Sequence, residues 1–242
     1  MTELMQKFST DANPTHPNLP PKDASTLILI DRSTGKPKIL LGRRHQGHAF
    51  VPNRFVFPGG RVDPGDRQMS VARPLDPRTQ DKLMRHTKRP SAAKAQALAL
   101  AAIRETFEET GLLLGEKRGE PPAAPAGPWA AFAEANVHPA LSDIHFIARA
   151  ITPPRRPRRY DTRFFAVDAS AIAHRIEGKV GPDAELVELV WLPLDETQSQ
   201  DLMIITELAL QDLRTRIEGG LDPALPVPFY RVQHGKRVRE WL

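Results

Sequence analysis

The sequence contains no cysteine, and this absence excludes several classes of chemistry. Without thiols the chain has no disulfide framework, no cysteine nucleophile and no thiolate ligand for a metal. It also lacks any apolar run near the roughly 20 residues that a helix needs to cross a bilayer, so we expect no membrane partner. Residues 1–23 are polar and rich in proline, without the apolar stretch of a signal peptide. We therefore predict a cytoplasmic protein that begins with a flexible arm over residues 1–23.

Aromatic residues are scarce as well, at 6% of the chain, whereas charged residues make up 26% and leave a net charge of +5. A positive balance favours anionic partners, which include phosphorylated small molecules and nucleic acids. The densest basic run is Arg155-Arg156-Pro157-Arg158-Arg159. It is interpreted as a solvated loop, as a phosphate-binding loop beside an active site, or as a nucleic-acid patch. Nucleic acid is the least favoured of these partners, because no aromatic residues interleave with the arginines.

The most informative segment is Arg104-Glu105-Thr106-Phe107-Glu108-Glu109-Thr110-Gly111-Leu112. Glu105, Glu108 and Glu109 stand at positions i, i+3 and i+4, so on a helix they share one face. Clustered carboxylate oxygens are the ligands that hard cations such as Mg²⁺ or Mn²⁺ prefer. Taken alone, such a triplet is better interpreted as the solvated face of a surface helix.

A glycine turn upstream changes that balance. Phe57-Pro58-Gly59-Gly60 follows an apolar stretch that has the character of a strand. Two glycines after a proline indicate a tight turn, where the backbone can come close to a ligand. The sequence thus places a glycine turn before a helix that carries a glutamate cluster and ends at a glycine.

In these residues the chain resembles the Nudix hydrolases, whose box reads Gly, five residues, Glu, seven residues, then Arg-Glu-apolar-x-Glu-Glu-x-Gly-apolar. Gly60 matches the first glycine, and the second half of the box is matched by Arg104, Glu105, Glu108, Glu109, Gly111 and Leu112. The chain departs from the pattern in two places. Asp66 stands where the family has Glu, and the spacer that follows is 67–103 instead of seven residues. The chain therefore resembles the subset with a long insertion inside the box, which includes coenzyme A diphosphatases.

The resemblance implies the α/β fold class, as a Nudix-type α/β/α sandwich with a mixed sheet and an inserted helical segment. We expect a single domain over residues 24–242, with residues 67–103 as the insertion. The sequence pattern predicts strands at residues 26–30, 38–43, 144–148, 162–167 and 185–192. It predicts helices at residues 77–86, 92–110 and 206–217, and the region after the last strand is expected to be helical.

The resemblance also implies roles within the box. Glu108 and Glu109 would hold Mg²⁺ or Mn²⁺, and Glu105 would bind metal or assist the attacking water. The backbone carbonyl of Gly59 would be a further metal ligand. Arg104 would orient the carboxylates, and as a neighbour four positions before Glu108 it can pair with that side chain.

Outside the box, the candidates are weaker. Glu185 and Glu188 precede Trp191-Leu192-Pro193 in a region where the family often carries its general base, and Glu188 is the preferred choice. Guanidinium groups suit bidentate contact with phosphate. Substrate contacts are therefore predicted for Arg43, Arg44 and Arg54. A substrate contact is also predicted for Gly60 in the box.

The predicted function is that of a metal-dependent hydrolase that cleaves the diphosphate linkage of a nucleoside diphosphate derivative. Coenzyme A or acyl-coenzyme A is the leading small-molecule substrate, and a homodimer is a further expectation. Two alternatives stay open. The split box and Asp66 suit a Nudix-fold nucleotide-binding regulatory protein without catalysis, and the basic run suits an RNA-processing Nudix enzyme.

Overall fold

The computed structural model describes residues 16–47 and 53–242, so most of the arm predicted at residues 1–23 lies outside the described residues. Residues 16–21 form no helix or strand, and β1 (Lys22–Asp31) takes up the last two positions assigned to the arm. In the part of the chain that is described, no helix has both the length and the apolar character that a membrane span requires.

The centre of the molecule is a mixed nine-stranded sheet. Its order is β11 (Leu186–Pro193), β2 (Lys38–Arg44), β1, β9 (Tyr160–Asp168), β8 (His145–Ile151), β12 (Pro228–Gln233) and β13 (Lys236–Trp241). Two short strands, β3 (Phe55–Val56) and β4 (Gly59–Arg61), pair with β2 and β1. β1 runs parallel to β9 and antiparallel to β2. Successive side chains of a strand point to opposite faces. A strand whose side chains are buried on both faces therefore needs a covering layer on each side, as β1 does.

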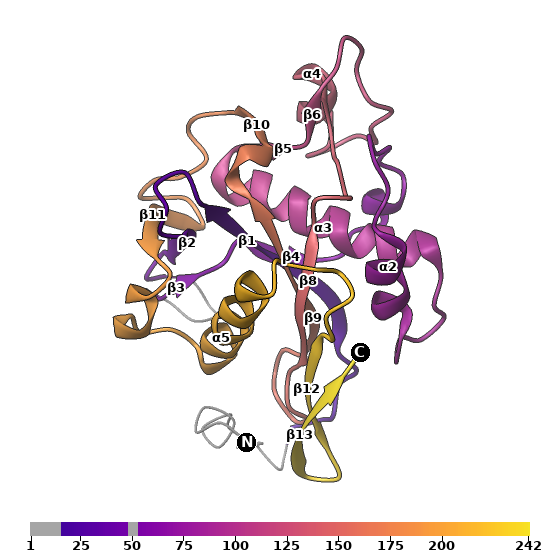
Figure 1. Ribbon diagram of the computed structural model, residues 1–242, viewed down its shortest axis with the longest axis vertical. Coiled ribbons are helices and arrows are strands. Elements are labelled where there is room, and N and C mark those ends of the chain that lie inside the picture. The colour runs from indigo at the N-terminus through magenta and orange to yellow at the C-terminus, as the bar shows by residue number, and fades with distance from the viewer. Residues whose placement is uncertain (1–15, 48–52) are drawn as a thin grey trace.

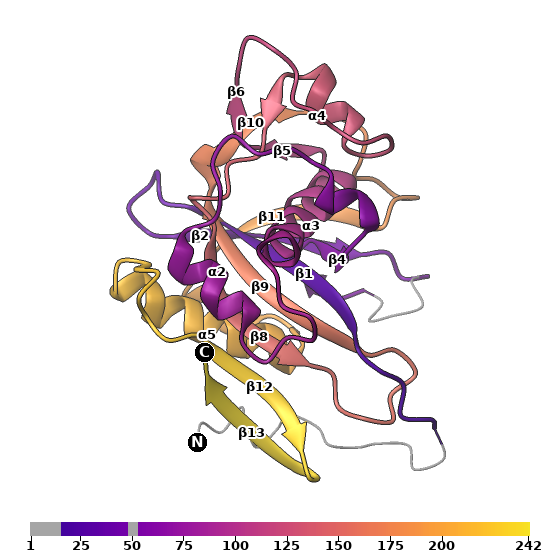
Figure 2. The same cartoon turned by 90° about the vertical axis from the view of Figure 1, so that its right-hand side faces the viewer.

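Two helices supply those layers. Leu27 and Leu29 of β1 pack in one core with α3 (Ala92–Thr110), whereas Ile28 and Ile30 pack in a second core with α5 (Ile204–Glu218). Figures 1 and 2 show α3 and α5 on the two sides of the strands. The mixed sheet between helices confirms the predicted α/β class and sandwich architecture.

Further strands and helices complete the fold. Two small sheets pair β5 (Leu112–Leu114) with β10 (Ile172–Arg175) and β6 (Glu116–Lys117) with β7 (Val137–His138). The other helices are α2 (Pro77–Met84), α4 (Ala130–Glu134) and the 3-10 turns Pro64–Arg67, Ala169–Ala171 and Glu196–Ser199.

The C-terminal region differs from the expectation of helix alone. After α5 the chain forms an antiparallel hairpin of β12 (Pro228–Gln233) and β13 (Lys236–Trp241), which extends one edge of the central sheet beyond β8. Each strand and helix that the sequence pattern predicted is present, with ends that shift by a few residues.

The insertion is an ordered part of the domain. Asp76 caps α2 through its side chain, and Ser91 caps α3 in the same way, as their positions predicted. The Lys82 ammonium of α2 donates to the carbonyl oxygens of Pro223 and Leu225, each at 2.5 Å. These bonds dock the insertion on the segment between α5 and the C-terminal hairpin.

Candidate active site

The end of α3 fixes the glutamate cluster in place. Gly111 ends the helix in the left-handed conformation, with φ of 77°, and its N–H donates to the Phe107 carbonyl. A Cβ atom at this position would lie 2.0 Å from the Ile176 carbonyl oxygen. Only glycine fits both the backbone angle and the contact.

The glycine turn brings β4 against both β1 and α3. A Cβ at Gly60 would lie 2.4 Å from Oε2 of Glu105, and one at Gly59 would lie 2.6 Å from the Ser25 carbonyl oxygen. The Gly59 N–H donates to Oε2 of Glu109 at 3.3 Å. Absence of side chains at these two positions therefore allows the backbone to approach the carboxylates.

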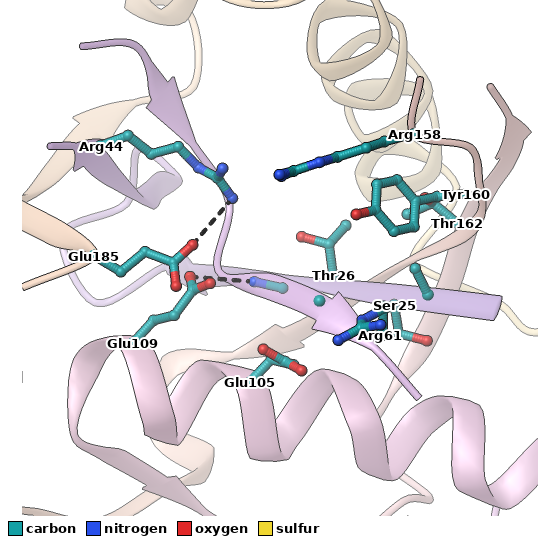
Figure 3. Close-up of a pocket in the computed structure, with 13 residues that line it drawn as sticks. Ser25, Thr26, Arg44, Arg61, Glu105, Glu109, Arg158, Tyr160, Thr162 and Glu185 are labelled. Atoms are coloured by element: carbon teal, nitrogen blue, oxygen red, sulfur yellow. Dashed lines mark hydrogen bonds and ion pairs between the residues drawn. The ribbon is translucent and has the colours of Figure 1, made fainter. Parts of the chain in front are cut away.

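A cavity of about 390 Å³ lies where these elements meet. Glu105 and Glu109 rise into it from α3, and Arg44 and Glu185 face it from the side of β2 and the segment before β11 (Figure 3). Arg158 and Tyr160 enter from the opposite side, at the start of β9. The buried hydroxyl of Ser25 in its wall has no hydrogen-bond partner within the described residues. The cavity thus combines carboxylates, cations and an unsatisfied polar group.

Burial makes negative charge costly on the α3 carboxylates. Burial raises the pKa of Glu109 well above its usual value, and the neighbouring charges of Glu185 and Glu105 raise it further against the opposing effect of Arg44. Burial likewise raises the pKa of Glu105, although the adjacent Arg104 guanidinium lowers it. A cation in the cavity would relieve both effects.

Glu108 is turned away from this cavity. Successive helix residues lie about 100° apart, so Glu108 and Glu109 face different sides although both flank Glu105. Glu108 lines a neighbouring groove and accepts a 2.7 Å hydrogen bond from Nη1 of Arg104. The same nitrogen donates to Oε1 of Glu105 at 2.8 Å. Arg104 thus contacts the carboxylates that the resemblance assigned to it.

Asp66, whose role the sequence left unassigned, holds the Arg104 guanidinium in place by accepting hydrogen bonds from it. It is fully buried and accepts from Nε of Arg104 at 2.7 Å and from Nη2 at 3.1 Å. It also accepts from Nε1 of Trp129 at 3.1 Å and from the Asp63 N–H at 2.8 Å. Burial opposes the charge of Arg104, but the hydrogen bonds to Asp66 and Glu108 outweigh it and raise the pKa of the guanidinium. Asp66 is therefore a positioning residue.

The donor set suits a hard divalent cation. Among residues 16–47 and 53–242, no three His, Cys, Asp or Glu side chains form a ready-made metal site. Mg²⁺ does not require one, because it keeps several waters and is typically held by one or two carboxylates together with substrate phosphates. Glu105 and Glu109 supply two such carboxylates in a cavity that disfavours their charge in the absence of a cation. Glu108 and the Gly59 carbonyl stay predictions as ligands.

The two candidates for the general base lie in different surroundings. Glu185 lines the cavity, with Oε1 at 3.4 Å from Nη2 of Arg44. Glu188 lies outside it on β11, where its half-exposed carboxylate pairs with Arg43 at 2.8 Å. The structure therefore favours Glu185 over the preferred choice from the sequence.

The predicted substrate arginines divide in the same way. Arg44 lines the cavity, whereas Arg43 and Arg54 are paired at its outside, the latter with Asp201 at 3.1 Å. Arg61 and Arg158 line the cavity and were not among the predicted substrate contacts. The position of Arg61 directly after the glycine turn could have indicated it, and Arg158 belongs to the basic run.

The insertion takes no part in the cavity wall. Of residues 67–103, none lines the cavity, and only Arg67 and Gln68 reach the neighbouring groove beside Glu108. Helix α2 of the insertion instead packs against α3, and its Lys82 bonds to the C-terminal segment.

Comparison with known proteins identifies similar folds and sequences. No protein-family model matches the chain. A solved NUDIX hydrolase from Alicyclobacillus acidocaldarius is similar over 79% of this chain and 90% of its own, with a TM-score of 0.58 and 29% identity. The chain is thus similar to a Nudix hydrolase in both fold and sequence.

Two curated relatives of this chain carry the name acyl-coenzyme A diphosphatase NUDT19. The Homo sapiens protein is 27% identical over 241 residues, which cover 78% of this chain and 59% of the relative. The Xenopus laevis protein is 32% identical over 131 residues, which cover 38% of this chain and 34% of the relative. The chain thus spans less than two thirds of the length of either relative.

Proposed function

We propose that this chain is a metal-dependent hydrolase that cleaves the diphosphate linkage of a nucleoside diphosphate derivative. The observation that carries the proposal is the convergence of Glu105, Glu109 and Glu185 on a cavity that also presents Arg44 and Arg158. Carboxylates bind hard cations, and guanidinium groups bind phosphate oxygens. One cavity therefore holds the two kinds of group that a metal–diphosphate complex needs.

Coenzyme A or an acyl-coenzyme A is the proposed substrate. The similarity to the NUDT19 proteins, whose names state acyl-coenzyme A diphosphatase activity, supports this choice. The long insertion within the box, which the chain shares with the coenzyme A diphosphatase-like subset that it resembles, supports it as well.

Each charged residue of the cavity has a separate proposed role. Bound Mg²⁺ or Mn²⁺ would neutralise diphosphate oxygens and lower the pKa of a bound water. Glu105 and Glu109 would hold the cation, while Arg104 fixes the Glu105 carboxylate. Arg44 would bind phosphate oxygens of the diphosphate from the other side of the cavity.

The hydrolytic step needs a proton acceptor. Glu185, whose carboxylate lies beside that of Glu109 (Figure 3), would accept the proton of the water that attacks one phosphorus atom. A new phosphorus–oxygen bond forms, the bridging phosphorus–oxygen bond breaks, and the leaving phosphate takes the electron pair. We assign this role to Glu185 in place of Glu188.

The test is a product assay with coenzyme A, acyl-coenzyme A, ADP-ribose, NADH and dinucleotides, each with Mg²⁺ or Mn²⁺ and again with chelator. We expect metal-dependent cleavage at the diphosphate, fastest with the coenzyme A compounds. Glu109→Gln and Glu185→Gln should each lower kcat/KM by about 10²-fold or more, because groups that stabilise charge at the reacting centre contribute several kcal/mol.

Glu188→Gln is the matched control, because it makes the same change on a half-exposed carboxylate outside the cavity. It should keep activity within a few-fold of the wild type. Binding of the nucleotides without any cleavage, by protein of unchanged circular dichroism, would instead establish the non-catalytic alternative.

A further inference from the structure

The central cavity adjoins two others of contrasting character, and the three follow one another along β1 and β9. A basic cavity of about 680 Å³ includes Lys22 of β1 and the loop 157–159 before β9. The central cavity includes residues 24–26 of β1 and Thr162 of β9. An apolar cavity of about 250 Å³ begins at Thr26 and continues to Phe164. Tyr160 lines all three cavities.

Three cations converge on the basic cavity without anionic partners. Within the described residues, the side chains of Lys22, Arg61 and Arg158 make no hydrogen bond or ion pair. The nearby carboxylate of Asp23 is already engaged, at 2.6 Å by Arg163 and at 2.9 Å by Lys94. Cations gathered in one place repel each other, so a bound anion would stabilise this arrangement.

The loop that carries Arg158 is braced by its neighbour. The Arg159 guanidinium donates to the carbonyl oxygens of Thr152 at 3.2 Å and Pro153 at 3.1 Å, and to Oδ1 of Asn18 at 2.8 Å. These bonds tie the two ends of the loop to each other and its second end to the segment before β1. A loop held in this way lets Arg158 bind an anion with a smaller loss of conformational entropy.

The surface of the apolar cavity is mostly apolar, although Arg44 and Thr162 reach it from the central cavity. Its walls include Phe57, Phe164, Met203 and Ile205. The Thr26 hydroxyl there already donates to the Pro58 carbonyl at 2.6 Å. A nucleobase would leave its polar edge unpaired against these walls, which is costly. An aliphatic group would lose no hydrogen bonds, and Met203 can adapt its shape to such a group.

We propose that these two cavities fix the direction in which an unsymmetrical diphosphate lies in the central cavity. The nucleoside end, carrying a further phosphate, binds at Lys22, Arg61 and Arg158, and the uncharged aliphatic end enters the cavity between β9 and the start of α5. This inference rests on the proposed function of the central cavity.

The test measures equilibrium binding of two fragments by calorimetry, in chelator so that no turnover occurs. The fragments are 3′,5′-ADP and 4′-phosphopantetheine, which are the two halves of coenzyme A. The wild type should bind 3′,5′-ADP more tightly than 5′-AMP. Arg61→Gln and Arg158→Gln should each remove about tenfold of that preference, the usual effect of one charge-assisted hydrogen bond. Neither should change phosphopantetheine binding.

Variants of the apolar cavity should affect the other fragment. Met203→Gln and Ile205→Asn should weaken phosphopantetheine by about tenfold, since burial of a few methylene groups contributes that much, and should leave 3′,5′-ADP unchanged. Arg32→Gln and Met84→Gln are matched controls, because Arg32 pairs with Asp168 away from the three cavities and Met84 lies in α2.

The outcomes separate this inference from the proposed hydrolase. Selective effects of the two pairs of variants support the orientation, even in a protein that cleaves nothing. Equal binding of 3′,5′-ADP and 5′-AMP, or effects that appear on the opposite fragment, would overturn it. An active enzyme whose fragments bind without such selectivity would retain the proposed function and lose the orientation.

Discussion

The glutamates of α3 show how neighbouring residues of one type come to differ. Glu109 is buried beside the Gly59 N–H, Glu105 lies against Gly60, and Glu108 is half exposed and paired with Arg104. The helix sets these differences, because it points adjacent residues in different directions. Asp66 completes the arrangement by holding Arg104 from within the core.

Asp66→Asn tests that support. The substitution leaves the buried guanidinium of Arg104 short of one negative partner, and loss of one member of a buried ion pair typically costs about 3–5 kcal/mol. We expect a loss near the lower end of that range, because Glu105 and Glu108 still pair with Arg104. Urea unfolding measures the free energy directly.

Asp63→Asn provides the comparison for Asp66→Asn. Asp63 is exposed and caps the short helix that contains Asp66, by accepting from the Gly65 N–H. Asn caps a helix about as well as Asp, so the unfolding free energy should stay within about 0.5 kcal/mol. Equal losses for the two variants would refute the role assigned to Asp66.

The spacing of the motif identified the residues of the box that meet at the cavity. It did not identify the residues from other segments that line the same cavity. The fixed order of the box put Gly59, Gly60, Glu105 and Glu109 together, and the structure places all four at the cavity. The choice between Glu185 and Glu188 depended on how β11 meets β2. That pairing shifts register between Leu186 and Glu188, and periodicity in the sequence does not reveal such an irregularity.

At the scale of elements, long periodic segments with capping residues were predictable and charged edge strands were not. α3 begins after Ser91 and ends before Gly111, as the capping residues predicted. The hairpin of β12 and β13 carries many charged residues and little alternation of apolar residues. Its turn, His234-Gly235, has positive φ at both residues, 49° and 75°. Asn-Gly or Asp-Gly is the commoner signal for such a turn.

Gly111→Ala tests the stop of α3. Alanine would be forced into the left-handed region, which costs about 1–2 kcal/mol, and its Cβ would also collide with the Ile176 carbonyl oxygen. We expect the unfolding free energy to fall by clearly more than the cost of the left-handed backbone conformation alone. Hydrolase activity should also fall, because the end of α3 must move.

Gly178→Ala isolates the backbone effect. Gly178 has a similar φ of 86°, but no atom lies within 4 Å of the position of its Cβ. The variant should lose only about 1–2 kcal/mol. If Gly111→Ala were no more destabilising than Gly178→Ala in chemical denaturation, the contact with Ile176 would have no energetic role.

For the molecule as a whole, a buried polar cluster joins the α5 layer to the last two strands. Asp212 of α5 accepts from the Tyr230 hydroxyl of β12 at 2.7 Å and from Nη2 of Arg239 of β13 at 2.8 Å. Burial raises the pKa of Asp212 to about 6, although these hydrogen bonds oppose the shift. The protonation of this carboxyl is therefore coupled to the stability of the folded protein.

The coupling gives stability a defined dependence on pH. Between about pH 4 and 6 the folded chain retains a proton on Asp212 that the unfolded chain has released, so the free energy of unfolding should fall as pH rises through that window. The fall attributable to Asp212 should be at most about 3 kcal/mol and should end above about pH 6.

Denaturant unfolding of the wild type and of Asp212→Asn across pH 4–7 measures this term as the difference between the two curves. Asp195→Asn, which changes an exposed carboxylate, should follow the wild-type curve. The same slope in the wild type and in Asp212→Asn would show that Asp212 ionises normally in the folded protein.

The parallel pairing of β1 with β9 has a consequence for synthesis on the ribosome. Lys22 pairs with Tyr160 and Ile30 with Asp168, so the centre of the sheet cannot close until residues far along the chain have been made. Contacts between such distant segments form slowly, and the intermediates expose apolar surface. Until residue 168 emerges, β1 lacks its parallel neighbour β9, and the sheet beneath α3 is incomplete. A chain interrupted before that point would carry the complete glutamate motif on a helix over an unfinished sheet, and would be a substrate for chaperones and proteases.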